Sequence, residues 1–266
     1  MDLENITLKV CDLSRSTGQY LLEQLRLIRG KDIELKDEHN FVTYVDRHAE
    51  EMIVDELSKI LPGSGFLAEE GTGGRSDNEV VWIIDPLDGT TNYVHGIPLF
   101  AISIALMISD QVVAGVVLEP NRDECFYAWK NGPAFLNNRM IRVSSAGQLQ
   151  NSLIVTGFPY KRDEILDPYI RLFKGFLQRT QDLRRLGSAA TDLAYVAAGR
   201  FEGFYEIGLN PWDVAAGSLI VRQAGGQVTD FDGRQDYLFG KSLVASNGHV
   251  HQEMKQVIAQ YFNGLT

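Results

Sequence analysis

The chain has 266 residues, 44% of them hydrophobic, which is enough to bury a sizeable core in one large domain or two closely packed ones. Its net charge of −10 argues against direct nucleic-acid binding, and no apolar run approaches the ~20 residues that a membrane-spanning helix needs. The first residues lack the basic and apolar regions of a secretory signal, so we expect a cytoplasmic protein without membrane association.

The cysteines and histidines exclude several kinds of site. Cys11 and Cys125 form no CxxC pair, so they indicate neither a disulfide framework nor a zinc ribbon, and we expect two buried free thiols. The five histidines have no metal-ligand spacing, and no pattern suggests a hydrolase triad. The basic cluster Arg184-Arg185 is interpreted as a solvated face rather than a nucleic-acid footprint.

The first half of the chain opens with helical periodicity. Apolar residues recur at helical spacing over 3–28 and over 45–60, before Pro62-Gly63 ends the second pattern. From Gly65 short apolar runs alternate with turn residues, which predicts a largely antiparallel sheet with strands at 66–68, 80–84, 101–108, 112–118 and 124–129. Asp110-Gln111 and the segment 120–123 are the predicted hairpin turns.

After about residue 150 strands and helices alternate. We expect strands at 153–156, 183–186, 203–207, 227–231 and 243–246, and helices at 165–177, 189–198, 213–224 and from 249 onward. This alternation predicts helices layered against sheets and a boundary near 144–150. We therefore expect an N-terminal lobe, 1–147, of helices and a largely antiparallel sheet, and an α/β lobe, 148–266.

The most informative motif is the run from Asp85 to Asn92, which reads DPLDGTTN and follows the apolar segment 80–84. Two carboxylates beside a buried strand must be neutralised, paired or bound to a metal. Mg²⁺ prefers carboxylate and carbonyl oxygens, and Asp85, Asp88 and the carbonyl of Leu87 could supply them from one turn. The motif predicts a divalent metal site at the end of this strand.

Further acids stand at the ends of other apolar elements, namely Glu69, Glu206 and Asp213. Taken singly, each is better explained as a turn or capping residue, and Asp213 is well placed to cap the helix that follows it. Together they could converge on the same cluster, because element ends are where sheets expose functional groups. Bound cations would turn such a cluster into a receptor for an anion.

Gly89 and Thr90 extend the motif toward phosphate binding. Gly89 allows a close backbone approach, and Thr90 is suited to begin a short helix whose free N–H groups favour an anion. The Thr90 hydroxyl could accept a proton from a metal-bound water, or it could simply cap the helix.

Two motifs together resemble a known family. The run from Asp85 to Tyr93, and Trp212 to Gly217 followed by Ala224-Gly225-Gly226, are similar to the paired signatures of the inositol monophosphatase family of Mg²⁺-dependent, lithium-sensitive phosphatases. The segments 186–190 and 208–211 are most similar to the bacterial branch. The resemblance implies a homodimer and a mixed α/β fold, the layered αβαβα sandwich of the sugar-phosphatase type.

The resemblance also implies two to three Mg²⁺ ions per site. The first metal would be held by Glu69, Asp85 and the Leu87 carbonyl, and the second by Asp85, Asp88 and Asp213. A third would be reached by Glu69 through water.

The resemblance also implies residues that activate the attacking water and bind the substrate. Thr90, with Asp46 as its hydrogen-bonded partner, would help to activate the nucleophilic water, and the N–H groups of Gly89 and Thr90 would hold the phosphate. The resemblance also implies a set of contacts to the ester and its hydroxyls, made by Asp88, Ser188, Ala189, Glu206 and Asp213.

Two positions depart from the family pattern. Asn210 stands where relatives often carry His or Arg, which removes a charge near the substrate. In the segment 36–40, Asp37 and Asn40 stand where Gly and Asp are common, so we expect this loop to bind the third metal differently.

The leading hypothesis is a Mg²⁺-dependent enzyme that hydrolyses inositol monophosphates by in-line attack of a metal-activated water. The alternatives are the same chemistry on a sugar phosphate, histidinol phosphate or an adenosine bisphosphate, or a regulatory protein acting on the transcription machinery. The length leaves little room for the insertions of bisphosphate relatives, and Glu206 suits a polyol hydroxyl. For the regulatory alternative, the negative net charge of the chain is compatible with a basic protein partner.

Overall fold

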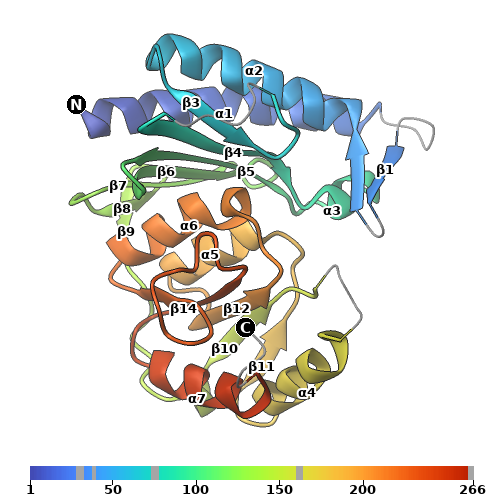
Figure 1. The fold of residues 1–266 in the computed structure, drawn as a ribbon, viewed down its shortest axis with the longest axis vertical. Coiled ribbons are helices and arrows are strands. Elements are labelled where there is room, and N and C mark those ends of the chain that lie inside the picture. The colour runs from blue at the N-terminus through green and yellow to red at the C-terminus, as the bar shows by residue number, and fades with distance from the viewer. Residues whose placement is uncertain (28–32, 38–39, 73–77, 160–163, 263–266) are drawn as a thin grey trace.

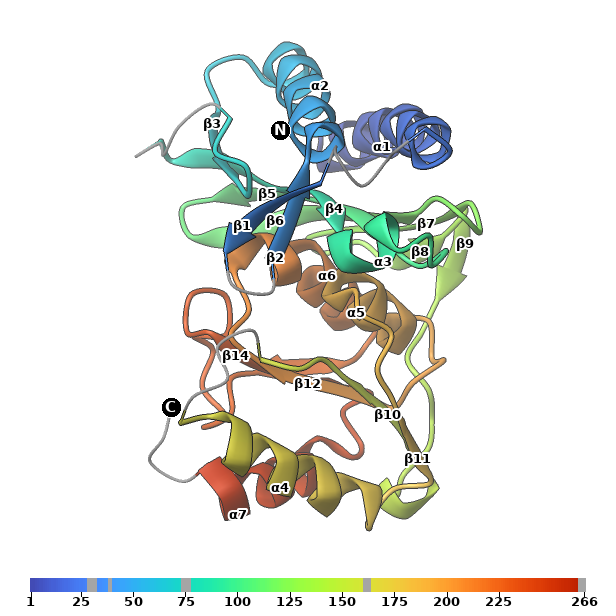
Figure 2. The same cartoon turned by 90° about the vertical axis from the view of Figure 1, so that its right-hand side faces the viewer.

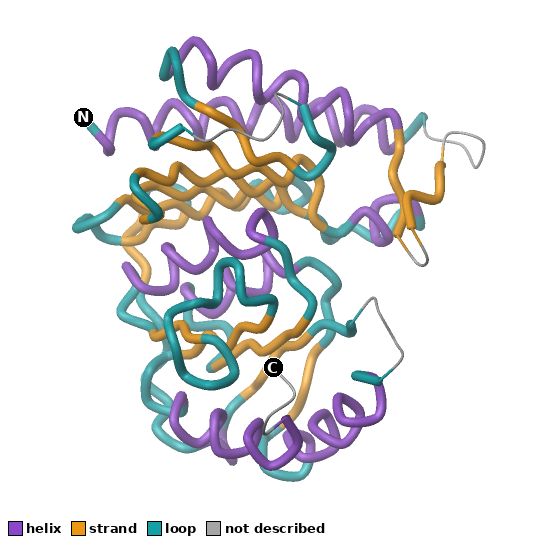
Figure 3. Tube along the Cα trace, in the orientation of Figure 1, coloured by secondary structure: helices purple, strands orange, loops and turns teal. Residues whose placement is uncertain are grey.

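The computed structural model describes residues 1–27, 33–37, 40–72, 78–159 and 164–262, and of 33–37 and 40–43 only the backbone. Its elements form five stacked layers, with helices outside, sheets beneath them and helices in the middle (Figures 1, 2 and 3). The predicted αβαβα order is therefore confirmed. None of the described helices is long and apolar enough to cross a membrane.

The first layer consists of α1 (Leu3–Leu25) and α2 (Tyr44–Ile60), which lie side by side on the outer face of the larger sheet (Figure 1). The hairpin of β1 (Ile33–Asp37) and β2 (Asn40–Thr43) precedes α2 and was not predicted. Asp37 and Asn40, which differ from the family pattern, belong to this hairpin. The side chains of the hairpin lie outside the described part of the chain, as do residues 38–39.

The larger sheet has seven strands in sequence order, and only β3 and β4 run parallel. Its strands are β3 (Gly65–Ala68), β4 (Val80–Asp88), β5 (Ala101–Ile108), β6 (Gln111–Glu119), β7 (Glu124–Trp129), β8 (Ala134–Leu136) and β9 (Arg139–Ile141). The antiparallel character is confirmed. The β5–β6 turn is wrong by one residue: Ser109 and Asp110 occupy it, because both have the positive φ that a tight hairpin requires.

The smaller sheet has the strand order β11-β10-β12-β14-β13. Its strands are β10 (Leu153–Thr156), β11 (Asp182–Arg184), β12 (Gly203–Ile207), β13 (Gln227–Thr229) and β14 (Ser242–Ser246). The outer helices α4 (Leu166–Leu177) and α7 (His251–Phe262) cover its far face (Figure 2). The strand predicted at 183–186 ends at Arg184, two residues earlier than expected, and residues 185–188 form a loop before α5.

The middle layer, α5 (Ala189–Ala197) and α6 (Pro211–Gln223), joins the two sheets. Every residue of α5 is buried, including the polar Thr191 and Asp192, because the helix lies between the two sheets. Small residues allow close packing here, because a Cβ on Gly115 of β6 would lie 2.9 Å from the Cα of Ala216. The start predicted for α6 at Asp213 is wrong, since Pro211 occupies the first helical position, where its missing N–H costs nothing.

Gly115 provides a test of this packing. We expect Gly115→Ala to lower the free energy of unfolding by about 1–3 kcal/mol, because the added methyl group overpacks a backbone contact. Gly147→Ala is the control, since a Cβ at Gly147 meets nothing within 4 Å. Urea unfolding of both variants measures the difference, and equal midpoints would contradict the packing argument.

Candidate active site

The predicted site residues meet where the carboxyl end of β4 faces the first turns of α5 and α6. Glu69 follows β3, beside Asp85 on β4, and its N–H donates to the carbonyl of Ile84 at 3.1 Å. Ser103 of β5 pairs with Asp85 across the sheet, and its Oγ donates to the carbonyl of Trp212 at 3.0 Å. This bond places the first turn of α6, and with it Asp213, against the end of β4.

Asp85 is the most deeply buried acid of the motif, with 1% of its surface exposed. The pairing of β4 with β5 shifts register between Asp85 and Asp88, which accommodates Pro86 inside the strand. Within this bulge the N–H of Leu87 donates to Asp85 Oδ1 at 2.9 Å. Burial, together with the charges of Glu69, Asp88 and Asp213, raises the pKa of Asp85 well above its usual range.

Asp88 links the two halves of the chain. Its Oδ2 accepts hydrogen bonds from Ser188 Oγ at 2.6 Å and from the N–H of Ala190 at 2.7 Å. Burial raises the pKa of Asp88 to about 6 although these bonds favour the charged form. Ser188 and Ala189 thus lie at the site, where Ser188 is the N-cap of α5.

Asp213 stands in the first turn of α6 as the N3 residue of a capping box, in which Asn210 is the N-cap. Its Oδ2 accepts a hydrogen bond from the N–H of Asn210 at 2.6 Å. Burial and the nearby charges of Asp88 and Glu69 raise its pKa well above the usual range. The capping explanation of Asp213 is therefore confirmed, and it leaves Oδ1, which accepts no hydrogen bond from the described residues, for a cation.

The three aspartates fit a hard divalent cation. In Asp85, Asp88 and Asp213 one carboxylate oxygen is fixed by a donor, while the other accepts no hydrogen bond from the described residues. Such outer bonds orient metal ligands in proteins. In the described part of the chain no three acidic, histidine or cysteine side chains stand close enough to form a ready metal cluster. Burial and the neighbouring charges disfavour the ionised forms of Asp85 and Asp213, and a bound cation would relieve this cost.

Thr90 lies between the metal motif and α2. Its Oγ1 lies 3.0 Å from the carbonyl oxygen of Leu87 and 3.3 Å from Oδ1 of Asp46, which is buried in the first turn of α2. Gly89, with φ of +95°, is the N-cap of the short helix α3 (Thr90–Val94). The capping explanation of the Thr90 hydroxyl is therefore wrong.

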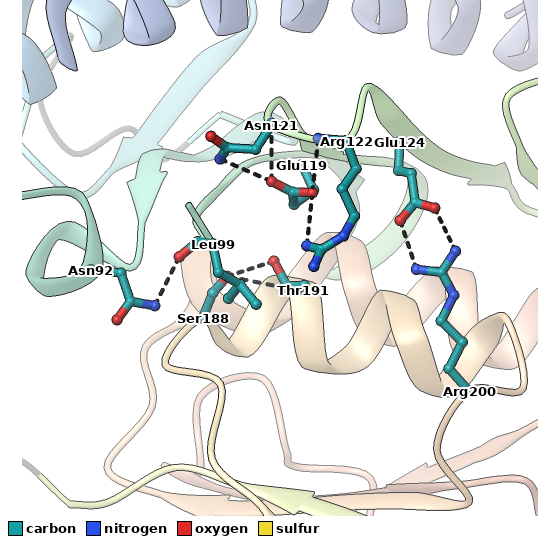
Figure 4. A network of polar contacts seen from close by, with 9 residues as sticks. All are labelled: Asn92, Leu99, Glu119, Asn121, Arg122, Glu124, Ser188, Thr191 and Arg200. Atoms are coloured by element: carbon teal, nitrogen blue, oxygen red, sulfur yellow. Dashed lines mark hydrogen bonds and ion pairs between the residues drawn. The ribbon is translucent and has the colours of Figure 1, made fainter. Parts of the chain in front are cut away.

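Sequence reasoning missed two residues that brace this region. The buried Glu50 of α2 accepts hydrogen bonds from the N–H groups of Glu70 and Thr72, both at 2.8 Å, and so fixes the segment after Glu69. Asn92 Nδ2 donates to the carbonyls of Leu99 and Leu186 at 2.8 and 2.9 Å (Figure 4 shows the first bond). The position of Glu50 on the apolar side of its helix was a signal that could have found it.

Two buried carboxyls stand on the smaller-sheet side of the site. Glu206 of β12 is 7% exposed, its carboxyl group packs against Gly157, and burial raises its pKa to about 8. Asp192 of α5 is 1% exposed, and its Oδ1 has no hydrogen-bond partner in the described residues. Burial and the charges of Glu206 and Asp88 raise the pKa of Asp192 well above the usual range. Asp192 was missed, although it is the one acid in the apolar run 189–198.

The raised pKa of Glu206 predicts a pH-dependent stability. Between its ordinary value of 4.5 and about 8 the folded chain holds a proton that the unfolded chain loses, so wild-type stability falls as pH rises through this window. Glu206→Gln removes this loss. We expect the melting temperature of Glu206→Gln to rise relative to wild type between pH 5 and pH 8.5, whereas a constant difference would contradict the assignment.

The comparisons with known proteins cover nearly the whole chain. Residues 2–265 match the inositol monophosphatase family. An inositol-1-monophosphatase of Mesorhizobium japonicum is 43% identical over 242 residues, which are 91% of each chain. A protein of Pseudomonas aeruginosa named Nus factor SuhB is 42% identical over 91% of this chain and 90% of its own.

Solved structures show the same fold. The extragenic suppressor protein suhB of Bartonella henselae has a TM-score of 0.91 at 39% identity, covering 97% of this chain and 98% of its own. An IMPase of Thermotoga maritima has a TM-score of 0.88 at 37% identity, with the same coverage of 97% and 98%.

Proposed function

Because this chain belongs to the inositol monophosphatase family, a family of phosphatases, we propose that it hydrolyses inositol monophosphates to inositol and phosphate with Mg²⁺ as cofactor. The observation that carries the proposal is the meeting of Asp85, Asp88 and Asp213, each with one oxygen fixed by a donor and one left for a cation. The proposal includes a homodimer, which rests on the family alone.

The chain offers two sets of metal ligands. One ion would be held by Glu69, Asp85 and the Leu87 carbonyl, and another by Asp85, Asp88 and Asp213, with Glu69 near a third. Bound Mg²⁺ would lower the pKa of a water molecule, neutralise the phosphate and stabilise the leaving alkoxide.

Thr90 and Asp46 would orient the attacking water. Thr90 Oγ1 lies 3.3 Å from Asp46 Oδ1, so its proton can point to that carboxylate while its lone pair faces the water. Water then adds to phosphorus as the bond from phosphorus to the inositol oxygen breaks. The proton that water loses passes toward Thr90 and Asp46, and the inositol oxygen gains one from solvent.

Backbone and side-chain groups would hold the ester. The first N–H groups of α3, which begins after Gly89, have no acceptor within the helix and suit the phosphate. Glu206, with the Ser188-Ala189 segment, would meet the hydroxyls of the alcohol. The same machinery could act on a sugar phosphate, histidinol phosphate or an adenosine bisphosphate, so the alcohol has to be identified by assay.

The role of Asp213 can be tested directly. Asp213→Asn keeps the shape of the side chain but removes its charge, so we expect kcat/KM to fall by about 100-fold or more. The far-UV circular dichroism spectrum and the melting curve should still be those of a folded protein. Asp110→Asn, the same change in an exposed hairpin turn whose positive φ Asn tolerates, should keep full activity. Wild-type turnover in Asp213→Asn would refute the proposed metal site.

The substrate proposal is tested by phosphate release from inositol monophosphates, sugar phosphates, histidinol phosphate and adenosine bisphosphate. We expect turnover that requires Mg²⁺, is inhibited by lithium and is highest on the inositol esters. A preference for another ester would agree with the proposed mechanism but contradict the proposed substrate. Absence of turnover across the whole panel would contradict the proposed enzyme.

A second candidate function is regulatory binding, favoured by the relatives named Nus factor SuhB. In this case the chain would bind a protein of the transcription machinery independently of catalysis. Co-purification of RNA polymerase that survives Asp213→Asn would support it, and purification of the chain alone would count against it.

A further inference from the structure

Arg185 is a positively charged side chain at the edge of the acidic site. It lies in the loop 185–188 between β11 and α5, and its guanidinium carbon is 5.6 Å from the ring centre of Phe158. Within the described residues its side chain makes no hydrogen bond or ion pair. Its neighbour Arg184 differs, because Nη1 of Arg184 lies 2.6 Å from Oδ2 of Asp182.

The backbone leaves room for this guanidinium. Gly187 has φ of +95°, and a Cβ there would collide with Nη1 of Arg185. The left-handed conformation requires a glycine here, and its missing side chain leaves the space that the guanidinium occupies. The ring of Phe158 supports the other side, an arrangement that favours a cation over an aromatic face.

Three carboxyl groups, the buried Asp192 and Glu206 and the partly buried Asp88, lie within reach of the charge of Arg185. Its positive charge acts on Asp88, Asp192 and Glu206, and none of the three forms an ion pair with it within 4 Å. The carboxyl group of Glu206 accepts no hydrogen bond from the described residues either. The guanidinium of Arg185 lies over Phe158, and the carboxyl group of Glu206 packs against the adjacent Gly157. Hydrogen-bond donors of Arg185 and acceptors of Glu206 therefore lie near one another without partners in the described residues.

This pairing of donors and acceptors matches a polyol. Each hydroxyl group both donates and accepts, so neighbouring hydroxyls on one ring can donate to a carboxyl oxygen and accept from a guanidinium.

We propose that Arg185 is a specificity-determining residue that donates hydrogen bonds to hydroxyls of the substrate alcohol, while other hydroxyls of the same ring donate to Glu206. The inference rests on the proposed function and assigns a residue that selects the alcohol rather than the phosphate. Phe158 and Gly187 hold the guanidinium in place for this contact.

The test compares two esters in three variants. Arg185→Gln removes the charge, Arg185→Lys keeps it without the planar fork, and Arg184→Gln is the matched control. Inositol 1-phosphate carries the ring hydroxyls, whereas 4-nitrophenyl phosphate presents the same phosphate without them.

For Arg185→Gln we expect KM for inositol 1-phosphate to rise about tenfold or more with kcat within about threefold, since hydrogen bonds from a charged donor are the strong ones. On 4-nitrophenyl phosphate kcat/KM should change by less than about twofold, because no hydroxyl contact is lost. Arg185→Lys should recover part of the loss, and Arg184→Gln should match wild type. Light scattering checks that the variants keep the wild-type assembly.

An equal loss on both esters, or the same loss in Arg184→Gln, would overturn the inference, because the residue would then only support the fold. Titration with free inositol, followed by NMR, separates this failure from failure of the proposed function. If wild type binds inositol more tightly than Arg185→Gln, Arg185 recognises the polyol even where no ester is hydrolysed. Equal binding, or no binding to wild type, would overturn the inference.

Discussion

Repulsion among buried carboxylates is the constraint on which this structure depends. Asp85, Asp88 and Asp213 interact through their charges, and burial raises the pKa of each. The chain tolerates the cluster because a backbone N–H fixes each of them, donated by Leu87, Ala190 and Asn210 respectively. These donors orient the acids without neutralising them, so the remaining electrostatic cost favours a bound cation.

The five-layer fold supplies those donors from distant parts of the chain. Leu87 belongs to the larger sheet, whereas Ala190 and Asn210 belong to the middle layer, whose first turns both face the end of β4. Close packing of that layer on β6, with Gly115 against Ala216, sets the distance between the two sheets. The polar contacts between layers in Figure 4, such as the pair of Arg200 with Glu124, hold the same interface at its edge.

Much of this could be predicted from local sequence, because apolar periodicity determines most elements and the DPLDGTTN run concentrates the acids. The short hairpin of β8 and β9 was missed, since its three-residue strands carry little pattern and its turn at Asn137-Asn138 is left-handed. Asp192 and Arg185 were missed for a different reason. Within their own segments they look like a helix residue and a solvated charge, and only the tertiary fold places both beside Glu206.

The electrostatics divide the site into two parts with different tasks. The aspartates around β4 would act on the phosphate through cations, so any phosphate monoester presents the same group to them. Glu206 and Arg185 lie on the side of the smaller sheet and, in our proposal, would meet the alcohol. Because Asp88 hydrogen-bonds Ser188 and Ala190 across the layers, the two parts stay in fixed register. Substitutions on the alcohol side can therefore change substrate preference while the metal ligands, and with them the chemistry, stay the same.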